Sequence, residues 1–536
     1  MSSQSAPIQS QNEKQEALPM SPKWDPEKLA KEVQELNDLA KAPFGTKVKG
    51  YVRRTGPGLL QSAMTLGAGS ATASVLAGAS FGYKLLWVQP IAMFLGVMMM
   101  AALSNIVLST KERPYVSFGR ELGKWCVLLW ALGTIFASVI WHFPQYTLLA
   151  GAGRDLFELF GYSLNNGGDI PAWVVSANQT LAPAGIVINT SITNIGYLVS
   201  ILVGLFFLAM NVFMVFNYGS GGRGIKMYEW FLRFVIMLVM LFFLVIVLMN
   251  VHKINWLEIF RGFTGYYGFP KNAQGVVETS TYLQVFGMLG AAVGINMTFL
   301  YPYSLLAKGW GKEHRTLAKW DLAMTMFIPF SIVTSLIIIA MTVTGVYDGI
   351  DGVKQGLAPL AAAESFRGLP GGRIIFCLGL MGMCGGAISA HMLVCGFTMC
   401  EMLGIKMTKN RFRLFAMTPT IGILGVVVPL PLWFPVIASA ICCVLLPIAY
   451  MIIFVLNNKR SFIKDAVGYG WKRAFNNLFL ILALCATTVA AYISCGKLVQ
   501  KFRDSKAAPQ KIESKVPAGS AAAPLPAVKP EAKPAK

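Results

Sequence analysis

Residues 55–83 read TGPGLLQSAMTLGAGSATASVLAGASFGY. The stretch is mostly apolar and long enough to cross a bilayer, which takes about 20 residues as a helix. Its centre consists of Gly67, Ala68, Gly69 and Ser70, and each glycine in a helix interior costs about 1 kcal/mol relative to alanine. The stretch therefore predicts a membrane span whose helix breaks near the middle of the bilayer, with no charged residue at the break.

Composition places the chain in a membrane. Hydrophobic residues make up 55% of its 536 residues and charged residues only 13%, whereas about 25% of a soluble domain is charged. Apolar runs of about 20 residues recur and predict a polytopic α-helical membrane protein. The net charge of +21 does not indicate nucleic-acid binding, because the basic residues gather in short loops between apolar runs, as in cytoplasmic loops. We expect the lipid bilayer, and no nucleic acid, as a partner.

The predicted organisation is a membrane domain between two polar ends. Residues 1–50 are expected to form a cytoplasmic polar arm with a short amphipathic helix that begins near Asp25. Residues 51–497 are expected to form an eleven-span domain, and residues 498–536, rich in Ala, Pro and Lys, a disordered tail. The spans are predicted near 55–79, 84–108, 125–149, 195–217, 227–251, 282–307, 320–346, 373–400, 414–432, 434–456 and 472–496.

Basic residues in alternate loops predict the orientation. One side carries clusters such as Lys308, Lys312, Arg315 and Lys319, and the other side carries fewer basic residues. The N-terminus is therefore predicted to be cytoplasmic and the C-terminus to lie outside. The basic residues after the last span disagree with this orientation, and a ten- or twelve-span count would place the tail inside.

A second interrupted span lies five spans further on. Residues 290–306 read GAAVGINMTFLYPYSLL, with Gly290, Gly294 and Asn296 near the middle of the sixth span. Breaks at matching positions of two halves predict an inverted repeat of five plus five helices, with a binding site at the bilayer midplane. Unwound backbone is tolerated there only where it lines a cavity inside the protein. The alternative is that the glycines serve close helix packing.

Several stretches resemble the natural resistance-associated macrophage protein family of divalent metal transporters. GPGLL (56–60) and LAGASFGYKLLWV (76–88) are similar to the flanks of the family's first helix. WLEIFRGF (256–263) is similar to the segment before its sixth helix, and KEHRTLAKWDLAM (312–324) to the loop after that helix. The resemblance covers about residues 50–497. It implies an all-α alternating-access transporter with the LeuT-type five-plus-five inverted repeat and an eleventh helix.

The metal-binding motifs of that family do not match. Where the family has Asp-Pro-Gly-Asn, this chain has Gly-Ala-Gly-Ser at 67–70, and where the family has Met-Pro-His, it has Gly-Ile-Asn at 294–296. The carboxylate, amide and thioether that the family uses are thus absent from the aligned positions. The resemblance therefore does not imply manganese or iron transfer by the usual chemistry.

The candidate substrate site consists of the residues at the two breaks, and any metal ligands among them remain unknown. A dication without a carboxylate partner is costly at the midplane, although a largely hydrated Mg²⁺ could pass a wide polar site. The amide groups at the start of the second half-helix could instead receive an anion such as a carboxylate. The predicted substrate-binding residues are Gly67, Ala68, Gly69, Ser70, Gly294, Asn296 and Met297.

Three further polar residues lie inside apolar spans and form a candidate proton or polar relay. His142 and Gln145 belong to the third span and His391 to the eighth. Ionisable residues inside a membrane are functional candidates, and histidine exchanges protons near neutral pH. The alternative is a neutral histidine hydrogen-bonded to a neighbouring carbonyl.

Taken together, the sequence predicts a secondary transporter that moves a small solute, by family inference a divalent metal cation, by alternating access. The alternatives are a transporter of a neutral or anionic small molecule such as an amino acid, and a non-transporting membrane sensor or scaffold. We expect no enzyme activity, because no nucleophile–base constellation is visible, and no cofactor. We expect an integral protein of a bacterial inner (plasma) membrane. The oligomeric state is not predicted.

Overall fold

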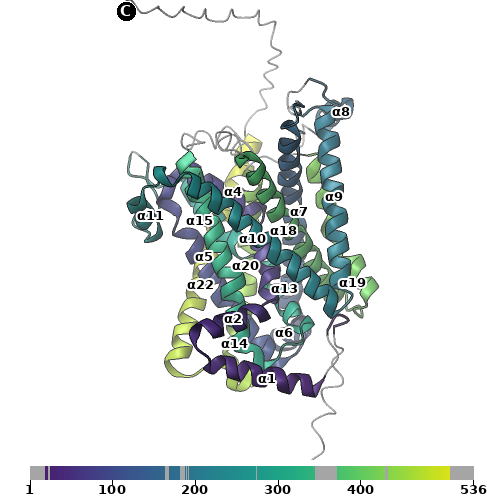
Figure 1. The fold of residues 1–536 in the computed structure, drawn as a ribbon, viewed down its shortest axis with the longest axis vertical. Helices are drawn as coiled ribbons and strands as arrows, with labels where there is room; N and C mark the ends of the chain where they lie inside the picture. Colours follow the sequence, from purple (N-terminus) through teal and green to yellow (C-terminus); the bar gives the residue numbers. More distant parts are fainter. Residues whose placement is uncertain are drawn as a thin grey trace, which may run out of the picture. The chain divides into compact units, whose positions relative to one another are not determined.

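The computed structural model of this chain describes residues 18–21, 25–162, 164, 168–181, 188, 190, 192–272, 274–344, 371–428 and 433–507. These residues form helices and their connections, and none of them belongs to a β-strand. The all-α prediction is therefore confirmed for the part of the chain that the structure describes (Figure 1).

Among these residues, eight helical stretches are long and apolar enough to cross a membrane, and a ninth results if two helices bent by 67° are joined. They correspond to nine of the predicted spans, and the two others, 55–79 and 414–432, have different structures. The stretches are α5 (Val88–Thr110), α7 (Lys124–Glu158), α9 (Asn194–Tyr218), α10 (Gly222–Met249), Gln284–Ala307, Lys312–Val343, α18 (Gly372–Met402), Gly470–Gly496, and the pair Cys442–Asn458 and Arg460–Ala466.

Both predicted breaks are present. The first span consists of α3 (Pro57–Thr65) and α4 (Ala68–Phe81), and the sixth of α12 (Thr279–Ala292) and α13 (Ile295–Ala307). The backbone leaves the helical conformation between the halves, where Gly67 and Gly294 are extended. Each break thus gives two short helices whose ends lie inside the protein.

The predicted helix at 414–432 is wrong in its conformation. The structure has α19 (Lys409–Ala416) followed by a 3₁₀-helix, η7 (Thr418–Val426), and residues 429–432 lie outside the described part. A proline at the second position of η7 lacks the amide hydrogen that a continuing α-helix needs. The chain also runs directly against α7, because a Cβ atom on Gly422 would lie 2.3 Å from Cβ of His142.

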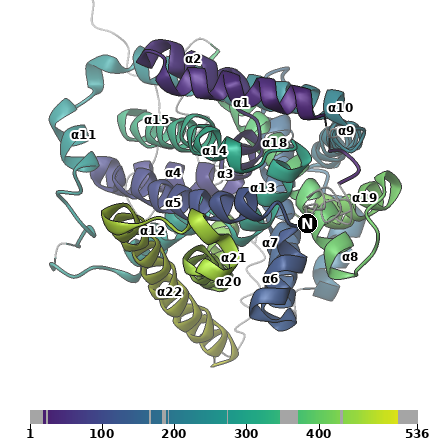
Figure 2. The same cartoon turned by 90° about the horizontal axis from the view of Figure 1, so that it is seen from below.

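The four half-helices lie in the centre of the helix packing. α3 contacts α13 and α18, while α4 contacts α12 and α15 (Ile328–Thr344). α7 contacts α4, α13, α18 and α20 (Trp433–Asn458). It continues as one helix through an internal proline. Figure 2 shows α3 and α13 between α5, α7, α15 and α18. The two breaks are thus enclosed by protein.

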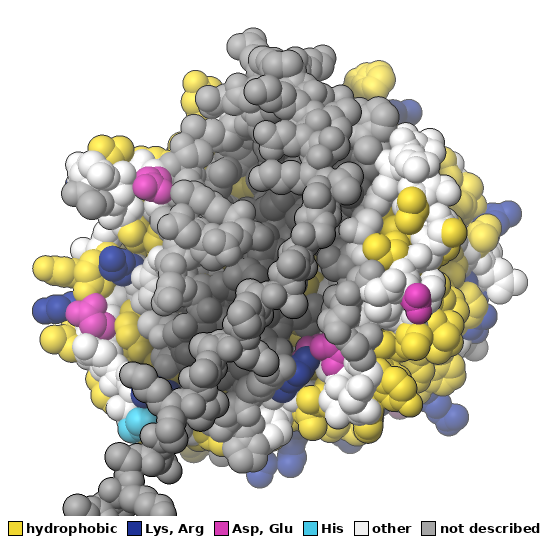
Figure 3. Space-filling view, turned by 90° about the horizontal axis from the view of Figure 1, so that it is seen from above, with side chains coloured by type: hydrophobic (Ala, Val, Ile, Leu, Met, Phe, Trp, Pro, Cys, Tyr) yellow, Lys and Arg dark blue, Asp and Glu magenta, His cyan; other side chains and the backbone are white. Residues whose placement is uncertain are grey.

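The outer helices present apolar side chains on their free faces. Phe206 and Phe213 of α9 are 65% and 57% exposed, and Met237 and Leu241 of α10 are 60% and 53% exposed. Figure 3 shows hydrophobic side chains along the flank of the molecule, with scattered Lys and Arg. In a bilayer such faces meet lipid, and the chain is therefore an integral membrane protein.

The two ends of the chain contribute further helices. α1 (Pro26–Lys41) begins after Asp25, whose carboxylate accepts a hydrogen bond from the Lys28 amide, and α2 (Phe44–Arg54) follows. The last helix, α22 (Gly470–Ala507), includes residues 498–507 of the predicted disordered tail, and residues 508–536 lie outside the described part.

Candidate functional site

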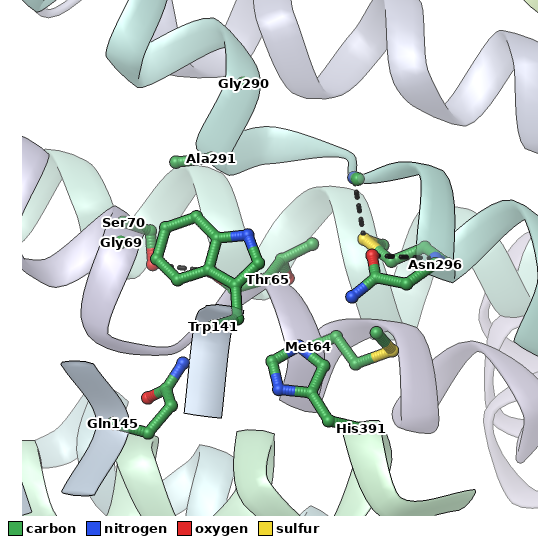
Figure 4. A pocket seen from close by; sticks show the side chains of 12 residues that line it. Met64, Thr65, Gly69, Ser70, Trp141, Gln145, Gly290, Ala291, Asn296 and His391 are labelled. Atoms are coloured by element: carbon green, nitrogen blue, oxygen red, sulfur yellow. Dashed lines mark hydrogen bonds between the residues drawn. The ribbon is translucent and has the colours of Figure 1, made fainter. Parts of the chain in front are cut away.

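The two breaks face one small cavity. Its volume is about 20 Å³, and a cavity of about 10–15 Å³ already holds one water molecule. Most of its lining side chains are almost completely buried, including Gln145, Asn296 and His391 at 1–2% exposure. Figure 4 shows how they converge. The lining residues are Met64, Thr65, Gly69, Ser70, Trp141, Gln145, Gly290, Ala291, Gly294, Asn296, Met297 and His391.

The glycines at the first break make room for two side chains of α7. A Cβ atom on Gly69 would lie 2.2 Å from the ring of Trp141, and one on Gly67 would lie 2.7 Å from Nε2 of Gln145. Neither glycine has a positive φ. The sequence therefore has glycine here because α7 approaches the break closely, and the break and α7 form one site.

Backbone amides at the start of α4 are hydrogen-bonded to uncharged side chains of the protein. The amide of Ala68 donates a hydrogen bond of 2.9 Å to Oε1 of Gln145, and the amide of Gly67 donates one of 3.3 Å to Oγ of Ser70. These amides belong to the set that an anionic substrate was predicted to use. Since Gln145 occupies that position, the geometry disfavours a carboxylate there.

At the second break a thioether lies beside the backbone. The amide of Gly294 donates a hydrogen bond of 3.3 Å to Sδ of Met297, and the carboxamide oxygen of Asn296 accepts one of 3.0 Å from the Met297 amide. The break in the sixth span therefore presents a sulfur atom and a carboxamide to the cavity, and both groups are uncharged.

Two histidines meet next to the cavity. Nδ1 of His142 lies 3.1 Å from the carbonyl oxygen of Ser138, and the rings of His142 and His391 are 5.4 Å apart between centroids. His391 lines the cavity, whereas His142 lies behind it, away from the lining. Nε2 of His142 and Nδ1 of His391 have no hydrogen-bond partner among the described residues.

The predicted residues are thus brought together to different degrees. The cavity is lined by seven of them: Gly69, Ser70, Gln145, Gly294, Asn296, Met297 and His391. The other three are outside the lining and contact residues that belong to it: Gly67 and Ala68 contact Gln145, and His142 contacts His391.

The sequence-based list missed several lining residues. Trp141 precedes Gln145 by four positions and so shares its helix face, a signal that could have identified it. Met64 lies in the last turn before the first break. Thr65, Gly290 and Ala291 lie at the helix ends next to the two breaks and also line the cavity, and only the fold brings them together.

A buried carboxylate holds the far end of α3, on the side of the protein that carries α1. Oδ1 of Asp321 accepts a hydrogen bond of 2.8 Å from the Gly56 amide, and Oδ2 accepts one of 2.6 Å from the Gly58 amide. Next to them Lys308 contacts Glu229 at 2.8 Å. A carboxylate at a helix N-terminus is favourable because the unpaired amides carry partial positive charge. α3 is thereby fixed to the seventh predicted span.

We predict that Asp321→Ala lowers the free energy of unfolding by about 1–3 kcal/mol, because it leaves two buried amides without an acceptor. Thermal unfolding in detergent measures the change. Asp38→Ala, which removes an exposed carboxylate from α1, is the matched control and is expected to change little. Equal unfolding temperatures for the two variants would contradict this role of Asp321.

An ion-pair cluster joins α7 and α18 at the opposite end. Nε of Arg373 donates a hydrogen bond of 2.8 Å to Asp155, and a second guanidinium nitrogen contacts Glu158 at 3.1 Å. Arg373 is only 11% exposed and Asp155 10%. Charged contacts therefore hold the helices together on both sides of the cavity, while the cavity lining itself contains no Asp or Glu in the described part of the chain.

Comparison with known proteins identifies the family to which the sequence is similar. The family model described as natural resistance-associated macrophage protein-like matches residues 58–494. Natural resistance-associated macrophage protein 1 of Homo sapiens and of Canis lupus familiaris are each 32% identical over 123 residues, which is 22% of this chain. The aligned stretch spans 20% of the length of these relatives.

Solved structures agree with the fold over most of the chain. A manganese transporter of Eremococcus coleocola, in complex with an aromatic bis-isothiourea substituted compound, has a TM-score of 0.61 at 13% identity, covering 86% of this chain and 91% of that one. MhsT in complex with L-phenylalanine has a TM-score of 0.52 at 16% identity, covering 82% and 98%. The predicted LeuT-type fold is therefore confirmed.

Proposed function

Because this chain belongs to the natural resistance-associated macrophage protein family, we propose that it is a secondary transporter that carries a metal cation through the cavity between its two broken helices. The observation that carries the proposal is that the first and sixth predicted spans both unwind and line one cavity enclosed by protein. Non-helical backbone at membrane depth is tolerated where it lines such a cavity, and it offers carbonyl groups to a cation.

In this proposal α3 is the moving element on the cytoplasmic side. The start of α3 is held by Asp321, and Lys308, which pairs with Glu229, also contacts the Thr55 carbonyl just before it. Release of these contacts would open the cavity toward the side of α1. Gln61 and Ser62 of α3 are buried, and their side-chain polar atoms have no partner among the described residues. Such groups usually bind water, and they would line the opened pathway.

On the other side, the Asp155–Arg373 contact between α7 and α18 would close the outer entrance. Alternating release of the two sets of contacts gives alternating access to a fixed site. We further propose that the N-terminus is cytoplasmic, since α1, α2 and the basic loops around Lys308 belong to that side, and that the membrane is a bacterial inner membrane.

The predicted site residues have distinct proposed roles. Asn296, Met297 and Ser70 contact the substrate, while Gly67 and Ala68 place Gln145 at the break. The relay predicted for His142, Gln145 and His391 stays a prediction, supported by the contact between the two histidine rings. In this proposal His142 acts as a positioning residue behind His391.

The cavity argues against the organic substrates considered above. Its volume of about 20 Å³ corresponds to one or two water molecules, whereas an amino acid is several times larger. The Ala68 amide, which an acidic group would need, is already bonded to Gln145. The size of the cavity therefore disfavours an amino acid, and the occupied amide disfavours an acidic group.

Uptake into liposomes tests the proposal. The full-length protein is reconstituted, and internal Mn²⁺, Mg²⁺, Ag⁺ and radiolabelled L-phenylalanine are measured over time. We expect saturable, protein-dependent uptake of at least one cation and none of phenylalanine. Uptake of phenylalanine alone would contradict the cation proposal. Absence of uptake for every solute, with folded protein in the membrane, would contradict transport and favour a sensor or scaffold.

A further inference from the structure

The cavity combines donor groups that are soft and uncharged. Two thioethers, Met64 and Met297, and one imidazole, His391, line it together with the carboxamide of Asn296. We propose that its cargo is a soft monovalent metal cation of the Cu⁺ type, held by the two sulfur atoms and the imidazole. The inference rests on the proposed function and specifies its substrate class.

The two thioethers come from the two broken spans. Met64 lies in the last turn of α3, directly before the first break, and Met297 follows the second break on α13. The bond from the Gly294 amide to Sδ fixes the position of the Met297 sulfur. Figure 4 shows the Met64 side chain between His391 and Asn296. One ion in the cavity could therefore contact a sulfur from each half of the repeat.

His391 supplies the nitrogen donor. The residue is 2% exposed, lines the cavity, and has an Nδ1 atom without a partner among the described residues. His142 lies against its ring on the side of α7. A neutral imidazole is a good ligand for copper, and burial between two helices fixes its orientation.

The charge of the site decides between cation classes. No Asp or Glu lines the cavity, and the described residues contain no group of three His, Cys, Asp or Glu that could hold a metal. In the Born expression the desolvation free energy grows with the square of the charge. A dication therefore loses four times as much hydration free energy as a monovalent ion of the same size. Uncharged ligands can replace the hydration free energy of a monovalent ion more readily than that of a dication.

Ligand chemistry leads to the same class. Mg²⁺ requires oxygen ligands and releases its waters reluctantly, and a cavity of about 20 Å³ has no room for a hydrated ion. Thioether sulfur prefers Cu⁺ among biological metals. The ion enters and leaves as Cu⁺, and the proposal includes no redox step.

Silver binding tests the proposal, because Ag⁺ has the charge and softness of Cu⁺ and is stable in air. The protein is the full chain in nanodiscs with Cys126, Cys485 and Cys495 changed to serine, since these thiols are not buried and would bind silver themselves. Isothermal titration gives the affinity of this parent and of its Met64→Leu and Met297→Leu variants. Leucine preserves volume. Met99→Leu, at a buried methionine of α5 outside the cavity, is the matched control.

We expect each cavity variant to weaken silver binding at least tenfold, with Met99→Leu unchanged and with no competition by Mn²⁺. Unaltered silver affinity in the Met64→Leu/Met297→Leu double variant, with an unfolding temperature equal to the parent, would overturn the proposal. Mn²⁺ or Mg²⁺ uptake into liposomes without silver binding in the cavity would also overturn it, yet leave transport standing. Silver binding that depends on the two methionines, without flux of any ion, would support the ligand set and contradict only the transport function.

Discussion

Gly69→Ala is expected to abolish transport and to destabilise the protein. The added Cβ atom would lie 2.2 Å from the ring of Trp141, and real Cβ contacts are never that short. Trp141 is 7% exposed, and the cavity that it lines is the space into which it can move. Overpacking of a buried contact costs about 1–3 kcal/mol, and the displaced indole would fill the cavity. Cation uptake into liposomes and the unfolding temperature in detergent measure the two effects.

Two further variants make this prediction specific. Gly222→Ala adds the same methyl group to a glycine with no neighbouring atom within 4 Å, and it should leave uptake and stability unchanged. Gly69→Ala combined with Trp141→Leu removes the overlap and should recover most of the stability. If the double variant is no more stable than Gly69→Ala alone, contact with Trp141 is not the reason for glycine at this position.

The second large effect is a change of ion preference. Gly67→Asp combined with Gln145→Ala is expected to tighten Mn²⁺ binding at least tenfold, which corresponds to about 1.4 kcal/mol. The new carboxylate supplies the charge that a dication needs. The second substitution removes the amide nitrogen 2.7 Å from the new Cβ atom, and Ala387, at 3.0 Å, must shift slightly. Isothermal titration of Mn²⁺ measures the gain.

Gly67→Asn combined with Gln145→Ala is the matched control, because it has the same shape without the charge. It should bind Mn²⁺ as weakly as the parent. Equal Mn²⁺ affinities in the Asp and Asn variants would mean that the first break does not contact the ion, and the alignment of Gly67 with a metal-binding position would be wrong.

Much of the fold could be predicted because local chemistry specifies it. Glycine-rich interruptions inside apolar runs identified both broken spans, since glycine weakens a helix wherever it occurs. The span at 414–432 was mispredicted because hydropathy does not distinguish an α-helix from a 3₁₀-helix. The close approach of Gly422 to His142 depends on two segments far apart in the sequence.

The site was predicted less completely than the fold. Residues at the breaks could be named from the backbone argument, and seven of the ten named residues line the cavity. Trp141 and Met64 were missed because apolar residues on a span look alike until neighbouring helices are placed. The sequence suggested that the amides at the start of α4 are free to bind an anion. Only the fold shows that Gln145 accepts the hydrogen bond of the Ala68 amide.

The most direct test of the account is the position of the transported ion. Anomalous diffraction from crystals of the protein with its exposed cysteines replaced, grown with whichever cation is taken up by liposomes, locates that ion. We predict one peak in the cavity, within bonding distance of both broken spans and nearest to Met64, Met297 and His391. A transported ion whose peaks all lie elsewhere would contradict the claim that the two breaks form the transport site.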